Sequence, residues 1–149
     1  MAEPRDRVSR KTDTLAMLAT RAIDAWVATA SATGAPHLVP VSLAWAEERV
    51  VIAVEASSVT ARNLTASGEA RVAVGPTRDV VMIDARLEKT VDVAADEKLG
   101  AAYAAQADWD PRSSPGYVFL VLRPVRIQAW RESNELPGRT LMRDGRWLL

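Results

Sequence analysis

The run from Pro36 to Trp45 constrains the fold more than any other segment of the chain. Its residues alternate between two faces, as in a β-strand, and one face carries His37, Val39, Val41, Leu43 and Trp45. Proline has no backbone N–H to donate to a neighbouring strand, and this run contains Pro36 and Pro40. We therefore expect the strand at the edge of a sheet or beside a bulge, where unpaired backbone is open to a flat ligand.

Similar patterns predict further strands on both sides of this run. They cover residues 25–31, 49–55, 70–74, 79–91 and 117–131, the last of them bent at Pro124. Apolar spacing and capping residues predict helices over residues 12–23, 59–66 and 94–107. Strands that follow one another through short turns do not fit a parallel sheet. The predicted fold class is therefore mainly β (α+β), an antiparallel barrel with about three covering helices.

The length of 149 residues suits one domain with a sizeable core. No repeat and no linker divides the chain. We expect residues 1–11, which are charged and lack an apolar pattern, to form a flexible tail, and residues 12–149 to form a single domain. Asp144-Gly145 near the end is a hairpin signal.

Composition narrows the possible functions. The 19 acidic and 19 basic residues balance, so nothing favours nucleic acid as a partner. No apolar run approaches the roughly 20 residues that span a bilayer, so we expect no membrane segment. The absence of cysteine excludes disulfides and thiolate chemistry, and a single histidine makes a structural metal site unexpected. These features suit a reducing compartment, so we expect a cytoplasmic protein.

The segment Val50–Leu64, VVIAVEASSVTARNL, carries the most chemical information. A strand leads into paired serines, and a helix begins immediately after them. The first turn of a helix has free N–H groups and a positive dipole end, which favour an anion. Hydroxyls of Ser57, Ser58 and Thr60 add donors, and Arg62 adds a permanent charge about one turn further on. The residues alone leave two interpretations open: a phosphate site, or a serine that caps a helix beside a solvated arginine.

Other polar residues give weaker signals. His37 is more typical of a structural histidine than of a catalytic one. Asp84 and Glu88 lie on the outward face of their strand and are expected to pair with Arg86 or Lys89. No Ser-His-Asp arrangement is indicated, and no catalytic residue is assigned. Trp130 shares a strand face with polar side chains, which is typical either of a wall against a flat ring or of a partly covered rim residue.

The order of these elements resembles the pyridoxamine 5'-phosphate oxidase-like split-barrel superfamily. The likeness covers roughly residues 12–131, and two pieces carry it best. One is the strand His37-Leu38-Val39-Pro40-Val41, and the other is Ala61-Arg62-Asn63-Leu64, which follows after the hairpin. Their order and spacing are more specific than either piece alone.

The resemblance implies a homodimer with cofactor sites between two barrels. Members bind FMN, the deazaflavin coenzyme F420 or, less often, haem. The backbone that corresponds to Val39, Pro40, Val41 and Ser42 lies beside the tricyclic ring. The segment that holds the phosphate corresponds to Ser57, Ser58, Thr60, Arg62 and Asn63. Trp130 is carried over as a further possible neighbour of the ring.

One departure from the family pattern affects the phosphate site. FMN-binding members usually carry Arg-Lys after the serine, where this chain has Val59 and Thr60. Each lost charged hydrogen bond costs about 1.5–3 kcal/mol of binding. Weak FMN binding, a preference for the deazaflavin and an empty site are all compatible with this change.

The leading functional hypothesis is a flavin- or deazaflavin-dependent oxidoreductase that transfers a hydride between the bound cofactor and a small planar substrate. The alternative is a non-catalytic protein that binds or stores a flavin or haem. Haem is disfavoured, because His37 is the only strong axial ligand that the sequence offers. A third possibility is a barrel that has lost its ligand and serves as an interaction module.

Overall fold

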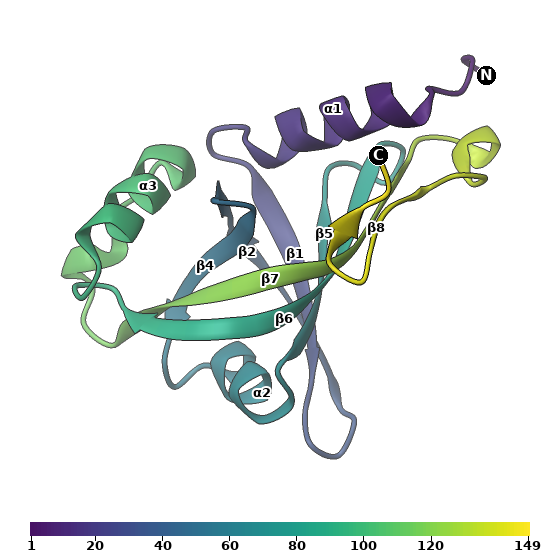
Figure 1. Cartoon of the computed structure of the whole chain (residues 1–149). Helices are drawn as coiled ribbons and strands as arrows, with labels where there is room; N and C mark the ends of the chain where they lie inside the picture. The colour runs from purple at the N-terminus through teal and green to yellow at the C-terminus, as the bar shows by residue number, and fades with distance from the viewer.

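The computed structural model describes all 149 residues. Three α-helices and nine strands make up the fold (Figure 1). The helices are α1 (Arg7–Leu18), α2 (Val59–Ser67) and α3 (Glu97–Ala107). The strands are β1 (Asp24–Ala30), β2 (Pro36–Ser42), β3 (Ala44–Ala46), β4 (Arg49–Glu55), β5 (Glu69–Val74), β6 (Val80–Asp92), β7 (Tyr117–Trp130), β8 (Thr140–Arg143) and β9 (Arg146–Trp147). The mainly β fold class and the three helices predicted from the sequence are thus confirmed.

All nine strands belong to one antiparallel sheet with the order β2-β1-β5-β6-β7-β4-β3, and the hairpin β8–β9 pairs with β7. The two end strands, β2 and β3, are the halves of one bent segment. Its first half pairs with β1 and its second half with β4. The sheet therefore curls into a split barrel without closing into a full one.

The bend in this segment corrects the prediction of one continuous strand over residues 36–45. Leu43 separates β2 from β3 because its side chain is fully buried in the core and its N–H donates to the carbonyl of Ile23 at 3.3 Å. The prediction of an edge position is confirmed, since β2 pairs with β1 alone.

The main core lies inside the curled sheet. It gathers the inward side chains of the strands with Leu18 from α1 and Leu64 from α2. These two helices cover opposite ends of the barrel (Figure 1). A second core packs α3 against the outer side of β4 and β7, around Tyr103 and Phe119. Burial raises the pKa of Tyr103 to about 12.

Helix α1 begins earlier than the sequence predicted. Asp6 is its N-cap and accepts a hydrogen bond from the N–H of Ser9 at 2.7 Å, so residues 7–11, expected in a flexible tail, are helical. The helix also ends at Leu18 instead of residue 23. Two other local predictions are confirmed. The ladder between β6 and β7 shifts register beside Pro124, and Asp144 and Gly145 form the turn between β8 and β9.

Candidate functional site

The start of α2 has the geometry of an anion site. Ser58 is the N-cap and accepts a hydrogen bond from the N–H of Ala61 at 3.1 Å. The N–H groups of Val59 and Thr60 have no acceptor within the chain. These free donors lie at the positive end of the helix dipole, and both features favour the binding of an anion there. The capping role of Ser58 is therefore confirmed, and it leaves two backbone donors available.

Arg62 adds an uncommitted positive charge to this helix start. Its backbone N–H donates to the carbonyl of Ser58 at 3.0 Å, which places it one turn into the helix. Its side chain is exposed, and no carboxylate or hydrogen-bond acceptor of the chain pairs with its guanidinium. Arg71 and Arg86, by contrast, are exposed on the sheet and paired with acids, so Arg62 is available for an external anion.

Two other predicted phosphate contacts point away from the surface. Thr60 is only 2% exposed and Asn63 only 7%. The amide nitrogen of Asn63 donates to the hydroxyl of Thr29 on β1 at 3.1 Å, a buried bond that fixes α2 on the sheet. The accessible members of the predicted set are therefore Ser57, Ser58 and Arg62.

The predicted ring-binding segment Val39–Ser42 lies in β2, a strand that contacts this helix. Pro40 is exposed and the other three residues are half-buried. One backbone edge of β2 pairs with β1 and the other has no strand partner. Because α2 packs on both β1 and β2, the two predicted segments belong to neighbouring elements of the fold.

Within one chain, Trp130 lies away from β2, where the predicted ring-binding segment is. It lies at the end of β7, and β1, β5 and β6 separate β7 from β2 in the sheet. Its half-exposed side chain lines a different part of the surface, beside Arg126 and Gln128.

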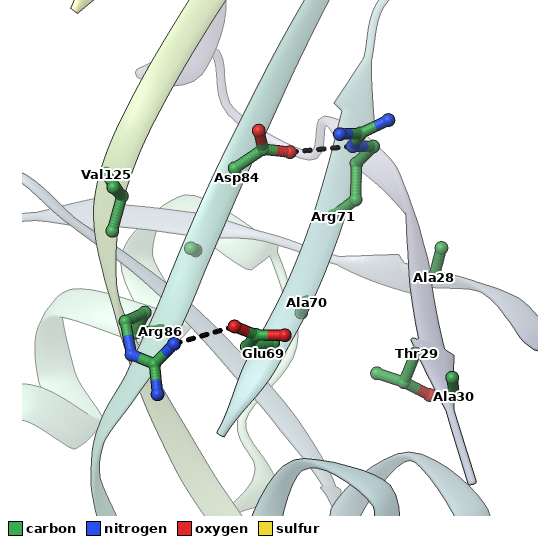
Figure 2. Close-up of a pocket in the computed structure, with 10 residues that line it drawn as sticks. Ala28, Thr29, Ala30, Glu69, Ala70, Arg71, Asp84, Arg86 and Val125 are labelled. Atoms are coloured by element: carbon green, nitrogen blue, oxygen red, sulfur yellow. Dashed lines mark hydrogen bonds and ion pairs between the residues drawn. The ribbon is translucent and has the colours of Figure 1, made fainter. Parts of the chain in front are cut away.

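A surface hollow, which we call the outer hollow, lies on the outer face of β1, β5, β6 and β7 (Figure 2). Its volume is about 560 Å³. Two ion pairs cross it, Arg71 with Asp84 at 2.6 Å and Arg86 with Glu69 at 2.8 Å. Its one link to the predicted site is Thr29, which lines the hollow and accepts the hydrogen bond from Asn63.

The outer hollow was not predicted from the sequence. The alternation of strands 70–74 and 79–91 did indicate that their charged side chains share the outer face of the sheet. Asp84 and Glu88 do form the surface ion pairs that were predicted, but with other partners. Asp84 pairs with Arg71 and with Arg126, and Glu88 pairs with Arg49 at 3.1 Å. The partners lie on neighbouring strands, and only the register of the sheet identifies them.

The chain contains no group of three or more histidine, cysteine, aspartate or glutamate side chains placed to hold a metal ion. None of its helices combines the length and the apolar character needed to cross a bilayer.

The sequence profile of the family described as pyridoxamine 5'-phosphate oxidase matches residues 12–131. No curated protein matches the chain. Solved structures share the fold at low identity. One described as an F420 reductase is 19% identical, with a TM-score of 0.62, over 74% of this chain and 92% of the other.

Two further structures show the range of proteins with this fold. General Stress Protein 26 from Bacillus anthracis is 14% identical, with a TM-score of 0.65, over 80% of this chain and 92% of the other. A haem-binding protein from Mycobacterium smegmatis is 19% identical, with a TM-score of 0.65, over 97% of this chain and 60% of the other.

Proposed function

The chain belongs to the pyridoxamine 5'-phosphate oxidase family, and from this premise we propose that it is a flavin- or deazaflavin-dependent oxidoreductase. In this proposal it transfers a hydride between the bound coenzyme, FMN or F420, and a small planar substrate. The bound coenzyme supplies the redox chemistry, while the protein binds it, orients it and shields it from water.

The observation that carries the proposal is the uncommitted Arg62 beside the free N–H groups at the start of α2. Together with the accessible hydroxyls of Ser57 and Ser58, this set consists of donors and one cation, which is the chemistry that a phosphate group requires. The ring of the coenzyme is proposed to lie along the backbone of Val39–Ser42 in β2, a strand that contacts the same helix. The residues present therefore fit a phosphate-bearing coenzyme.

The first test replaces Arg62 with alanine. We expect FMN or F420 to bind about tenfold more weakly, because one charged hydrogen bond is worth about 1.5 kcal/mol. Fluorescence titration of the purified protein with each coenzyme measures the change. Arg143→Ala is the matched control, since Arg143 is also exposed and unpaired but lies on β8, away from α2. Equal affinities for the wild type and the Arg62→Ala variant would rule out this phosphate site.

A second candidate function is binding of a flavin or haem without catalysis. The loss of the two cations at Val59 and Thr60 favours it, because a weaker phosphate site suits transient binding. Absorbance of the purified protein identifies the bound cofactor, with a band at about 450 nm for FMN, a band at about 420 nm for F420 and a Soret band for haem. Turnover of a reduced coenzyme distinguishes an enzyme from a carrier.

We also propose that the protein is a homodimer in the cytoplasm. An exposed apolar patch on β1 and β2 supports the dimer. Trp26 is 51% exposed and lies opposite Pro40, while Leu38 is 59% exposed and lies opposite Ala28. Such a contiguous patch is typical of an interface between proteins. The absence of cysteine supports the proposed cytoplasmic location, because proteins of reducing compartments rarely contain disulfides.

Leu38→Asp is expected to convert the dimer to a monomer, because a charge in the centre of an apolar interface is left unpaired and desolvated. Sedimentation velocity measures the change in mass. The control is Thr33→Asp, in the exposed turn between β1 and β2. A wild-type chain that sediments as a monomer, or a Leu38→Asp variant that remains a dimer, would contradict the proposal.

A further inference from the structure

The bond between Asn63 and Thr29 is the only side-chain hydrogen bond that joins α2 to a strand distant in the sequence. The amide nitrogen of Asn63 donates to the hydroxyl of Thr29 on β1 at 3.1 Å. Both residues are 7% exposed, so the contact lies largely out of water, where a hydrogen bond is stronger. Burial prevents Asn63 from touching a phosphate at the surface, and its polar group therefore needs another explanation.

The other contacts of the helix body with the sheet are apolar. Ala61 is 4% exposed and Leu64 is fully buried, and both belong to the main core. Apolar packing holds the helix on the barrel, but it is not directional as a hydrogen bond is. At the far end, the carbonyl of Gly68 accepts a hydrogen bond from the N–H of Leu87 on β6 at 2.8 Å. Within the helix itself, the bond from Asn63 is therefore the directional contact with the sheet.

The rotation of α2 about its axis decides where Arg62 points. Successive residues lie about 100° apart around a helix, so the direction of Asn63 sets that of its neighbour. With Asn63 facing Thr29, Arg62 lies on the exposed side. The free N–H groups of Val59 and Thr60 belong to the same first turn, so any rotation or slide of the helix moves all of these donors together.

The strand that anchors Asn63 also fixes the proposed ring segment. β1 pairs with the whole of β2, from Asp24 opposite Ser42 to Ala30 opposite Pro36. Thr29 is part of this ladder and lies opposite His37. The ring and the phosphate of one coenzyme are joined by a short chain, so the two parts of its site must keep a matching spacing. β1 is the element that both parts share.

We propose that Asn63 is a positioning residue for the coenzyme phosphate and acts through Thr29. It does not touch the phosphate. Its bond to β1 sets the rotation of α2, so that Arg62 and the free N–H groups meet the phosphate of a coenzyme whose ring lies on β2. The inference rests on the proposed function and deepens it, because it assigns a residue that sets the phosphate site without contacting the ligand.

The test compares a coenzyme with its form that lacks the phosphate, by fluorescence titration of the purified full-length chain. The probes are FMN with riboflavin, and F420 with the deazaflavin that lacks the phosphate-bearing chain. In the pair that the wild type binds more tightly, we expect the phosphate form to bind at least about tenfold more tightly. Thr29→Val removes the hydroxyl at nearly constant shape, and Asn63→Leu removes the amide. Each should reduce this preference to about threefold or less, while the affinity for the phosphate-free form stays within about twofold.

Three further variants separate positioning from a general loss of stability. Thr29→Ser keeps the hydroxyl and should keep the preference. Thr14→Val is the matched control, because Thr14 is 2% exposed on α1 and its hydroxyl has no partner in the chain. It should leave the preference within about twofold. In the Thr29→Val background, Arg62→Ala should weaken binding of the phosphate form only about threefold, since the helix no longer directs the guanidinium at the phosphate.

The outcomes distinguish this inference from the proposed function. A wild type that binds both forms equally, or binds neither, would contradict the phosphate site itself, and the inference would fall with it. A wild type that prefers the phosphate form, with Thr29→Val and Asn63→Leu variants that keep the preference, would overturn the positioning role alone. Equal weakening of both forms would overturn it too, because that is the effect of a bond that only stabilises the fold. Thermal melting confirms that the variants are folded, and valine at position 29 is a residue that suits a strand.

Discussion

Replacement of Glu135 by glutamine is expected to lower the free energy of unfolding by about 3 kcal/mol, because removal of one partner from a buried ion pair leaves the other uncompensated. Glu135 is 2% exposed. Its carboxylate accepts hydrogen bonds from the backbone N–H of Arg5 at 2.8 Å and from the side chain of Arg5 at 2.7 and 2.9 Å. It also accepts one from the backbone N–H of Arg131 at 2.9 Å. Denaturant unfolding at neutral pH measures the loss.

Arg10 makes the loss of Glu135 more costly. It is 3% exposed, and its guanidinium donates only to backbone carbonyls, those of Ala129 at 3.2 Å, Glu135 at 2.9 Å and Arg5 at 3.3 Å. Burial lowers the pKa of Arg10, and the charge of Glu135 opposes that effect. Without the carboxylate, two arginines remain in a partly dry site at the junction of α1 and the loop before β8.

The control for Glu135 is a fully exposed ion pair. Glu47 lies 3.2 Å from Lys98, and their side chains are 81% and 88% exposed. Glu47→Gln should change the free energy of unfolding by less than about 0.5 kcal/mol, because water and salt screen such a pair. Similar losses in the two variants would contradict the role assigned to Glu135.

The dependence of stability on pH gives a second measurement of the same contact. The hydrogen bonds from Arg5 lower the pKa of Glu135 from 4.5 to about 2. A carboxylate with a depressed pKa in the folded state stabilises the protein above its unfolded pKa and loses that effect as the pH falls through the folded pKa. Wild-type stability should therefore fall between about pH 4.5 and about pH 2, and Glu135→Gln should lose less over this range.

Local patterns predicted much of this fold. The alternation of apolar and polar residues located the strands, and Pro36 and Pro40 predicted the edge position of β2. Both patterns can be read within a single strand. The start of α1 was missed because the reason for it lies elsewhere in the chain. Residues 7–11 have no apolar stripe, and this turn is held by Arg10, whose acceptors lie about 120 residues away in β7 and the following loop. A contact of that separation leaves no local pattern.

Some features of the candidate site also follow from local sequence, while others depend on the fold. The cap at Ser58 and the exposed Arg62 follow from the helix start alone, and sequence identified both. The burial of Asn63 against Thr29 and the separation of Trp130 from β2 depend on sheet order and register. The charged lining of the outer hollow depends on which arginine faces which acid across the strands. Sequence therefore predicted the helix cap and the exposed arginine, but not the burial of Thr60 and Asn63 or the surface around them.

Gly75→Ala is expected to lower the free energy of unfolding by about 3 kcal/mol or more, through two independent effects. Gly75 follows β5 with a φ of +87°, a conformation that costs an alanine about 1–2 kcal/mol. A methyl group there would also overlap the carbonyl oxygen of Asp79, which belongs to a hydrogen-bonded turn, and would lie 2.8 Å from the sulfur of Met17 on α1. Met17 can move, but the backbone of the turn can relieve the overlap only by shifting β6, which begins one residue later.

Gly34→Ala isolates the first of these effects. Gly34, in the turn between β1 and β2, has a φ of +85°, and a methyl group there would meet nothing within 4 Å. This variant should lose only about 1 kcal/mol, the conformational part of the cost, when both are unfolded in urea under the same conditions. The difference between the two variants then measures the crowding where α1 crosses the end of β5. If both lose the same amount, the contact with Asp79 relaxes freely and the packing of α1 on this end of the barrel is looser than the structure describes.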